Sequence, residues 1–177
     1  LLALLEQHRI TSFFAPPTVW IALLRSPLFD TTDLSSLAKG YYGASIMPLE
    51  VLRELATRLP KVRLWNLYGQ TEIAPLATML APDDQLRKPG SAGPAMPGVT
   101  LKILGDDGHE LPPNTPGLIY IDQPATPDFN YVGNAESRQR MEMRGLKTMG
   151  DIGYLDDEGF LFIVDRKGTV AYKYLGG

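Results

Sequence analysis

The order of apolar runs in the first 70 residues constrains the fold more than any other feature of the sequence. Segments typical of strands alternate with segments typical of helices: strands at residues 10–15, 37–42 and 62–68, helices at 16–27 and 48–59, and the end of one more helix at 1–9. In the 48–59 segment, leucines recur every three or four residues, and Pro60 ends the pattern. Pro16 and Pro17 suit the first turn of the helix predicted at 16–27. This alternation predicts a parallel sheet with crossover helices.

The pattern changes near Pro89, where glycine and proline become dense. Short strand-like runs follow, separated by turn residues: strands at 99–104 and 118–121, a short helix at 135–143, and a hairpin of 154–155 and 160–164 around the acidic turn 156–159. We therefore predict an α/β fold class. It comprises the end of a parallel-sheet α/β subdomain (1–96) followed by a β-rich, barrel-like subdomain (97–165).

Composition excludes several classes of function. The 177 residues hold 17 basic and 20 acidic side chains, a net charge of -3, which argues against nucleic acid as a partner. No apolar stretch approaches the roughly 20 residues that cross a bilayer, so we expect no transmembrane segment. The absence of cysteine rules out disulfides, thiolate metal ligands and a cysteine nucleophile. These features fit a cytoplasmic protein.

A candidate site follows the third predicted strand. This strand ends at Gly69, so Thr71 and Glu72 should lie just beyond its carboxyl end, where open α/β sheets bind ligands. The Glu72 carboxylate suits a hard cation such as Mg²⁺, and the Thr71 hydroxyl can donate to a phosphate oxygen or bind the ion. The alternative is that both residues only begin a loop or cap a helix.

A second candidate group lies about eighty residues later. Asp151 follows Gly150, and Arg166 follows the second strand of the predicted hairpin. A carboxylate has two oxygens and can accept hydrogen bonds from two vicinal hydroxyls. Alternatively, Asp151 bonds only to the backbone of a turn, and Arg166 forms a surface ion pair.

Taken together, the Tyr-Gly-Gln-Thr-Glu motif (residues 68–72), the Gly-Asp motif (150–151) and the Asp-Arg pair (165–166) resemble the adenylate-forming superfamily. This superfamily includes the acyl-CoA synthetases, adenylation domains and luciferases. The resemblance covers nearly the whole chain. It implies the end of a large N-terminal domain, with residues 166–177 as a hinge stub and the C-terminal domain absent.

The resemblance also implies a role for each matching residue. Thr71 and Glu72 become catalytic residues, with Glu72 the metal ligand, and Tyr68 stacks on adenine, although a core aromatic is the alternative. Asp151 and Arg166 bind the ribose. The implied nucleotide-binding residues are Gly43, Ala44, Ser45, Asn66, Leu67, Tyr68, Gly69, Thr71, Asp151 and Arg166.

The implied function is that of an ATP-dependent carboxylic acid–CoA ligase, which uses ATP, Mg²⁺ and coenzyme A on a fatty or related carboxylic acid. This segment alone is expected to be inactive and able to associate with itself. Gln70 favours an acyl-CoA synthetase over an amino-acid-activating adenylation domain of a peptide synthetase, the first alternative. Two segments that depart from the family pattern, Gly117-Leu118 and Gly145-Leu146-Lys147-Thr148-Met149, leave a non-catalytic nucleotide-binding homologue as the second alternative. A further departure is Tyr42, which stands where glycine is common beside residues 43–45.

Overall fold

A computed structural model describes residues 1–73, 76–124, 129, 132, 141–143, 145–148 and 150–166. The chain forms two compact units. The first unit comprises Leu1–Tyr68 and Met79–Ser91, and the second comprises Gly69–Thr78 and Ala92–Gly177.

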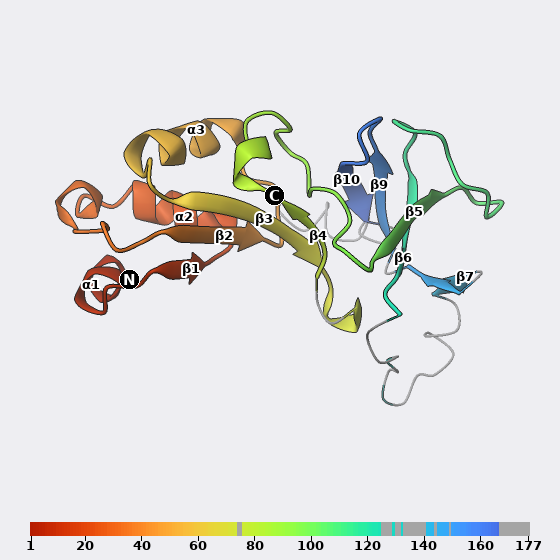
Figure 1. Cartoon of the computed structure of the whole chain (residues 1–177), viewed down its shortest axis with the longest axis horizontal. Helices are drawn as coiled ribbons and strands as arrows, with labels where there is room; N and C mark the ends of the chain where they lie inside the picture. The colour runs from red at the N-terminus through yellow and green to blue at the C-terminus, as the bar shows by residue number, and fades with distance from the viewer. Residues whose placement is uncertain are drawn as a thin grey trace, which may run out of the picture. The chain divides into compact units, whose positions relative to one another are not determined.

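The first unit alternates strands and helices in the predicted order. Its elements are α1 (Leu2–Gln7), β1 (Ser12–Phe14), α2 (Pro17–Leu24), the 3-10 turn η1 (Phe29–Thr31), β2 (Lys39–Gly43), α3 (Leu49–Arg58), β3 (Arg63–Gly69) and the turn η3 (Pro82–Asp84). Strand β2 pairs in parallel with both β1 and β3. The sheet has the order β1-β2-β3-β4, in which β4 is Leu76–Leu80 (Figure 1). The predicted parallel sheet is confirmed.

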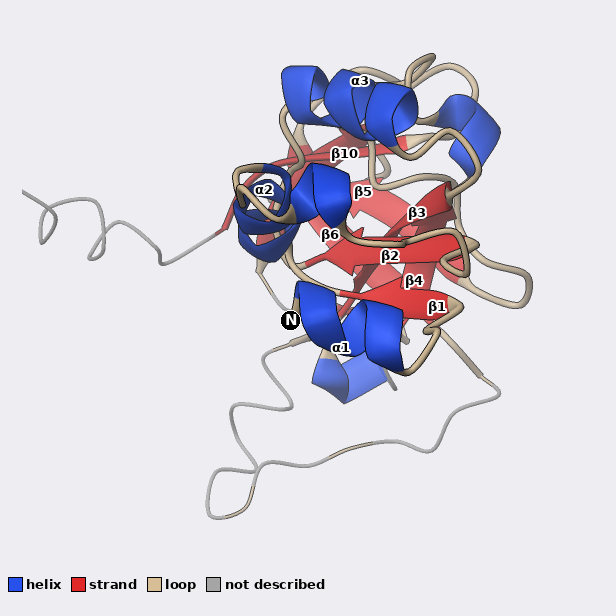
Figure 2. Ribbon diagram, turned by 90° about the vertical axis from the view of Figure 1, so that its left-hand side faces the viewer, coloured by secondary structure: helices blue, strands red, loops and turns tan. Residues whose placement is uncertain are grey.

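Helices α2 and α3 lie beside the sheet of the first unit (Figure 2). Their apolar side chains enter the core of this unit. Trp20 on α2 is 1% exposed, and its ring packs edge-on against Phe13 of β1. Its indole nitrogen donates a hydrogen bond to the Tyr41 carbonyl of β2 at 3.1 Å. Leu52 and Leu55 fill the same core from α3. The leucine spacing that predicts an amphipathic helix therefore marks the face that is buried.

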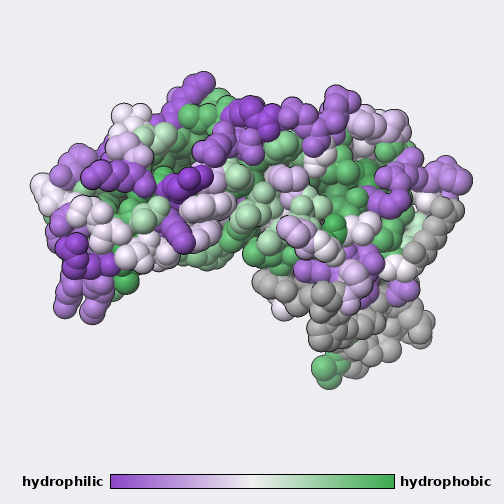
Figure 3. Space-filling view, viewed as in Figure 1, coloured by the Kyte–Doolittle hydropathy of each residue, from purple (hydrophilic) through white to green (hydrophobic). Residues whose placement is uncertain are grey.

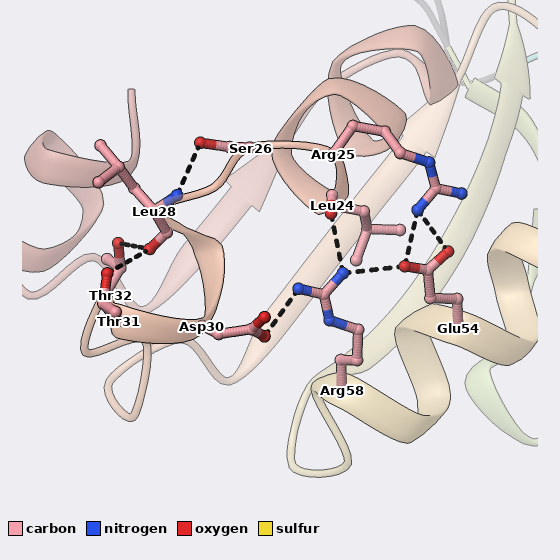
Figure 4. A network of polar contacts seen from close by, with 9 residues as sticks. All are labelled: Leu24, Arg25, Ser26, Leu28, Asp30, Thr31, Thr32, Glu54 and Arg58. Carbon is pink, nitrogen blue, oxygen red and sulfur yellow. Dashed lines mark hydrogen bonds and ion pairs between the residues drawn. The ribbon is translucent and has the colours of Figure 1, made fainter.

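A polar network joins α2, η1 and α3 (Figure 4). Arg58 donates to the Leu24 carbonyl at 2.8 Å, to Glu54 at 2.9 Å and to Asp30 at 2.7 Å. Arg25 donates to both carboxylate oxygens of Glu54 at 2.8 Å. These charge-assisted hydrogen bonds from Arg25 and Arg58 hold the pKa of the Glu54 carboxyl below its usual range.

The second unit is mainly antiparallel. It contains the 3-10 turn η2 (Thr71–Ile73), β5 (Thr100–Leu104), β6 (Gly117–Asp122), β7 (Glu142–Met143), β8 (Leu146–Lys147), β9 (Asp151–Leu155) and β10 (Leu161–Arg166). The sheet has the order β10-β9-β6-β8-β7, with β5 also paired to β6. The β-rich character is confirmed, but the strands that the structure describes form an open sheet and do not close into a barrel.

The hairpin of β9 and β10 confirms the predicted turn. Asp156 accepts hydrogen bonds from the Glu158 and Phe160 amides through its side chain, at 3.0 and 2.9 Å. Gly159 completes the turn with a φ of 80°, a conformation that side chains disfavour. Asp156 therefore shapes the turn.

The helix predicted at 135–143 is wrong at its C-terminal end. Glu142 and Met143 form β7, which pairs with β8 across Gly145, a glycine with a φ of 78°. A turn residue of this kind stabilises a hairpin, and the apolar spacing alone did not reveal it. The rest of the segment, 135–140, lies outside the described residues, as does the tail 167–177 of the expected hinge stub.

Hydrophobic side chains reach the surface among hydrophilic ones (Figure 3). In the first unit, the large exposed hydrophobic residues are Leu1, Leu4, Phe14, Leu28, Ile46 and Leu86. Within the part of the chain that the structure describes, no helix combines the length and apolar character needed to span a bilayer.

Candidate functional site

In the first unit, the predicted ligand-binding residues meet at one edge of the sheet. Strands β2 and β3 are parallel neighbours, and Gly43 lies opposite Leu67. Because both strands end here, Ala44 and Ser45 leave the sheet at the edge where Tyr68 lies. Ala44 and Ser45 are exposed, whereas Leu67 and Tyr68 are half-buried.

Close approach of the two backbones explains the small residues at this edge. A Cβ atom on Gly43 would lie 2.5 Å from the carbonyl oxygen of Leu67, too close for any larger residue without separating the strands. Ala44 then turns the chain with a φ of 68°, which is uncommon for a residue with a side chain. The edge is therefore shaped by backbone geometry and left open by small side chains.

Tyr42, which stands where the family commonly has glycine, has its side chain in the core and not at this edge. The Tyr42 side chain is 2% exposed and belongs to the core, while Tyr41 stacks on Trp65 at a centroid distance of 5.2 Å. Successive strand residues point to opposite faces, so the Tyr42 ring enters the helix-covered side. There its hydroxyl donates to Oε1 of Gln85 at 2.8 Å, and burial raises the pKa of that hydroxyl. Tyr42 is a core residue.

Asn66 has a structural contact of its own. Its side chain is 9% exposed, and its Nδ2 donates to the Ser91 carbonyl at 2.8 Å, within the first unit. One side of this amide therefore ties β3 to the segment that ends the unit.

In the second unit, the 68–72 motif continues into a short turn. Thr71 and Glu72 begin η2, and Thr71 is exposed while Glu72 is half-buried. Both residues lie directly after the end of β3, as the sequence predicts.

In the 150–151 motif, a turn at Gly150 leads into strand β9. Gly150 has a φ of 86°, and its amide donates a hydrogen bond to the Thr148 hydroxyl oxygen at 3.2 Å. Asp151 is the first residue of β9 and is only 8% exposed. In the antiparallel pairing of β9 with β10, position 166 is opposite Asp151. The two predicted ribose ligands therefore occupy paired positions.

A contact between Gln70 and Asp151 joins the two motifs. Gln70 Nε2 donates a hydrogen bond to Asp151 Oδ2, although the residues are 81 positions apart. From the sequence, Gln70 only favoured one enzyme class over another. Its place between Gly69 and Thr71, both assigned to the site, was the available signal that its side chain also lies there.

Glu72 offers the donor chemistry that Mg²⁺ requires. No three His, Asp or Glu side chains among the described residues gather into a cluster that could hold a metal ion alone. Mg²⁺ in nucleotide sites is commonly held by one or two carboxylates and by the phosphates of the substrate. A half-buried carboxylate beside an exposed hydroxyl fits that arrangement.

Comparison with known proteins places the chain in a class. The model of the AMP-binding enzyme family matches residues 1–127. The chain therefore belongs to the AMP-binding enzyme family, and the predicted adenylate-forming ancestry is confirmed.

Two similar proteins carry CoA-ligase names. The chain is 36% identical over 163 residues to an indoleacetate–CoA ligase of Aromatoleum aromaticum, covering 92% of this chain and 31% of that protein. It is 35% identical over 181 residues to 4-coumarate–CoA ligase 1 of Glycine max, covering 98% and 61%. The chain thus spans about a third to three-fifths of the length of these relatives.

Solved structures agree on the fold. The N-terminal domain of FACL13 from Mycobacterium tuberculosis superposes with a TM-score of 0.84 at 28% identity, over 93% of this chain and 40% of that one. The predicted fold, that of an adenylate-forming N-terminal domain, is confirmed.

Proposed function

We propose that the full-length enzyme, meaning a protein of its relatives' length that contains this chain, is an AMP-forming carboxylic acid–CoA ligase. A carboxylate oxygen of the acid attacks the α-phosphorus of ATP, the bond to the β-phosphate breaks, and pyrophosphate leaves. The thiol of coenzyme A then attacks the acyl carbon of the adenylate, and AMP leaves with the electron pair of the acyl–oxygen bond.

The observation that carries this proposal is the contact between Gln70 and Asp151. It brings the end of the 68–72 motif and the 150–151 motif together within one compact unit. Gln70, which follows β3, and the buried carboxylate of Asp151, at the start of β9, therefore lie side by side. Such convergence suits a ligand that carries both phosphates and hydroxyls, as ATP does.

The chain's own residues would bind and orient the nucleotide. We assign adenine stacking to Tyr68, and the lining of the adenine site to the small-residue edge at 43–45 with Asn66, Leu67 and Gly69. Asp151 would accept hydrogen bonds from the ribose hydroxyls, and Arg166 would contact the ribose from the opposed strand position.

Thr71 and Glu72 would act on the phosphates. The Thr71 hydroxyl would donate to a phosphate oxygen, and Glu72 would hold Mg²⁺, which when bound neutralises phosphate charge and polarises the phosphorus. Fixed donors and charges of this kind stabilise the charge that develops as pyrophosphate leaves.

We infer that the acid is hydrophobic, either fatty or aromatic. The relatives named for indoleacetate and 4-coumarate, both aromatic acids, favour an aromatic ring. The relatives' CoA-ligase names likewise favour CoA over an amine or a carrier protein as the acceptor.

The test is acid-dependent exchange of labelled pyrophosphate into ATP by the full-length enzyme, with hydrophobic aromatic acids, fatty acids and amino acids in parallel. We expect exchange with a hydrophobic acid and, on addition of coenzyme A, its acyl thioester. Exchange with amino acids alone would favour an adenylation domain. Tight nucleotide binding without exchange for any acid would contradict the proposal and favour a non-catalytic homologue.

A further inference from the structure

We propose that Gln70 is a positioning residue that orients the Asp151 carboxylate and thereby sets the preference of the enzyme for ribose over deoxyribose. This inference rests on the proposed function, because it assumes that Asp151 binds the ribose.

The chemistry of the contact fixes which atoms meet. An ionised carboxylate only accepts hydrogen bonds, so the amide must present Nε2 to Asp151, as it does in the structure. A hydrogen bond to a charged group is roughly twice as strong as a neutral one. The Gln70 side chain therefore restrains the rotation of the carboxylate about its Cβ–Cγ bond.

The other end of the amide supports this role. Oε1 of Gln70 is buried and has no hydrogen-bond partner among the residues that the structure describes. Burying such an oxygen is unfavourable, whereas an apolar side chain of the same length would fill the space without that cost. The polar amide at this position is therefore explained by its donor, and the donor is bonded to Asp151.

The orientation of the Asp151 carboxylate matters because it must accept hydrogen bonds from two ribose hydroxyls at once. Asp151 lies at the start of β9 and is almost fully buried, so its backbone is held by the strand while its carboxylate plane depends on side-chain contacts. A carboxylate in the wrong plane can accept from one ribose hydroxyl but not from both. Loss of the Gln70 donor should then weaken the binding of ATP more than the binding of an ATP analogue that lacks one ribose hydroxyl.

The test compares ATP with 2′-deoxy-ATP and 3′-deoxy-ATP in the full-length enzyme. Gln70→Met keeps the length of the side chain and removes the donor. We expect the ratio of kcat/KM for ATP to that for each deoxy analogue to fall by about tenfold, the scale of one hydrogen bond to a charged group. The KM for the carboxylic acid should not change.

Gln123→Met is the matched control. Gln123 is also half-buried in the second unit, but its Nε2 donates to the Leu76 carbonyl at 3.3 Å. The same chemical change there should leave the ribose preference intact. Gln70→Leu, which also removes the donor, should lower the ribose preference to a similar extent, and it carries the test if methionine disturbs folding.

Asp151→Asn separates this inference from the proposed function. If Asp151→Asn abolishes the ribose preference while both Gln70 variants retain it, the positioning role is refuted and the ribose role of Asp151 stands. If Asp151→Asn leaves the ribose preference unchanged, the ribose role of Asp151 and the positioning role of Gln70 are both refuted. An equal rise in KM for ATP and for the acid in the Gln70 variants would show a merely structural role and also overturn the inference.

Discussion

Replacing Tyr42 with phenylalanine should destabilise the first unit through a single lost donor. The Tyr42 hydroxyl donates to Oε1 of Gln85, whose Nε2 donates in turn to the Leu80 carbonyl at 3.1 Å. Both side chains are buried, at 2% and 5% exposure. Tyr42→Phe leaves Gln85 Oε1 buried without its donor, which costs about 1–3 kcal/mol.

The assay is urea unfolding of the chain followed by tryptophan fluorescence. The two tryptophans, Trp20 and Trp65, both lie in the first unit, so the signal reports on that unit. Tyr41→Phe is the control, because the Tyr41 ring stacks on Trp65 and its substitution should change the free energy of unfolding by less than about 0.5 kcal/mol.

A double-mutant cycle with Gln85→Met isolates the pair. Each single change leaves a buried polar atom without a partner, whereas the double change removes both atoms of the bond. The double variant should therefore be more stable than the sum of the single effects implies, by about 1 kcal/mol or more. Strict additivity, or a Tyr42→Phe midpoint equal to the parent's, would refute the reasoning.

The same site predicts a dependence on pH. Burial raises the pKa of the Tyr42 hydroxyl above its ordinary value of 10.0. A group whose pKa is raised on folding contributes stability that is complete below the unfolded pKa and is lost as pH rises toward the folded pKa. Above about pH 10, the parent should therefore lose up to about 1.4 kcal/mol per pH unit that Tyr42→Phe does not lose.

Three further predictions concern charge and catalysis. Glu54→Gln should lose less stability than the parent between about pH 5 and pH 3, because the pKa of Glu54 is lowered and its contribution to stability is lost as pH falls through the folded pKa. Urea unfolding at each pH measures this, and Glu50→Gln, which removes an exposed ion pair with Arg53, is the control. In the full-length enzyme, Glu72→Gln should raise the Mg²⁺ concentration needed for half-maximal pyrophosphate exchange, and an unchanged titration would remove Glu72 from the mechanism. The chain alone, which spans 31% of the indoleacetate relative, should form no acyl-adenylate and should associate through its exposed apolar residues; acid-dependent pyrophosphate release by a monomer would contradict both expectations.

Local pattern predicts most of the first unit. The leucine spacing of α3 and the stop at Pro60 mark a helix that packs on one face, and Pro17 begins α2 as its position suggests. Parallel pairing of β1, β2 and β3 follows from the crossover helices between them. These features depend on residues close in sequence, which is why they can be read there.

Pattern is weaker where a few residues decide the structure. Strands β7 and β8 have two residues each and depend on the turn at Gly145, and the sequence analysis placed the end of a helix where β7 lies. Strand β4 was not predicted, although its neighbour in the sheet, β3, is the strand that precedes it in the chain. Its five residues form a run too short for periodicity to separate a strand from a helix.

For the site, the sequence by itself determined the candidate residues that we propose for the chemistry: a carboxylate and a hydroxyl after a strand, and an aspartate after a glycine. Only the tertiary structure decided two further points. It turned the Tyr42 ring into the core, because strand alternation and the helix layer leave that face buried. It also placed the Gln70 amide against Asp151, because a contact across 81 residues depends on how β9 enters its sheet, which no local pattern encodes.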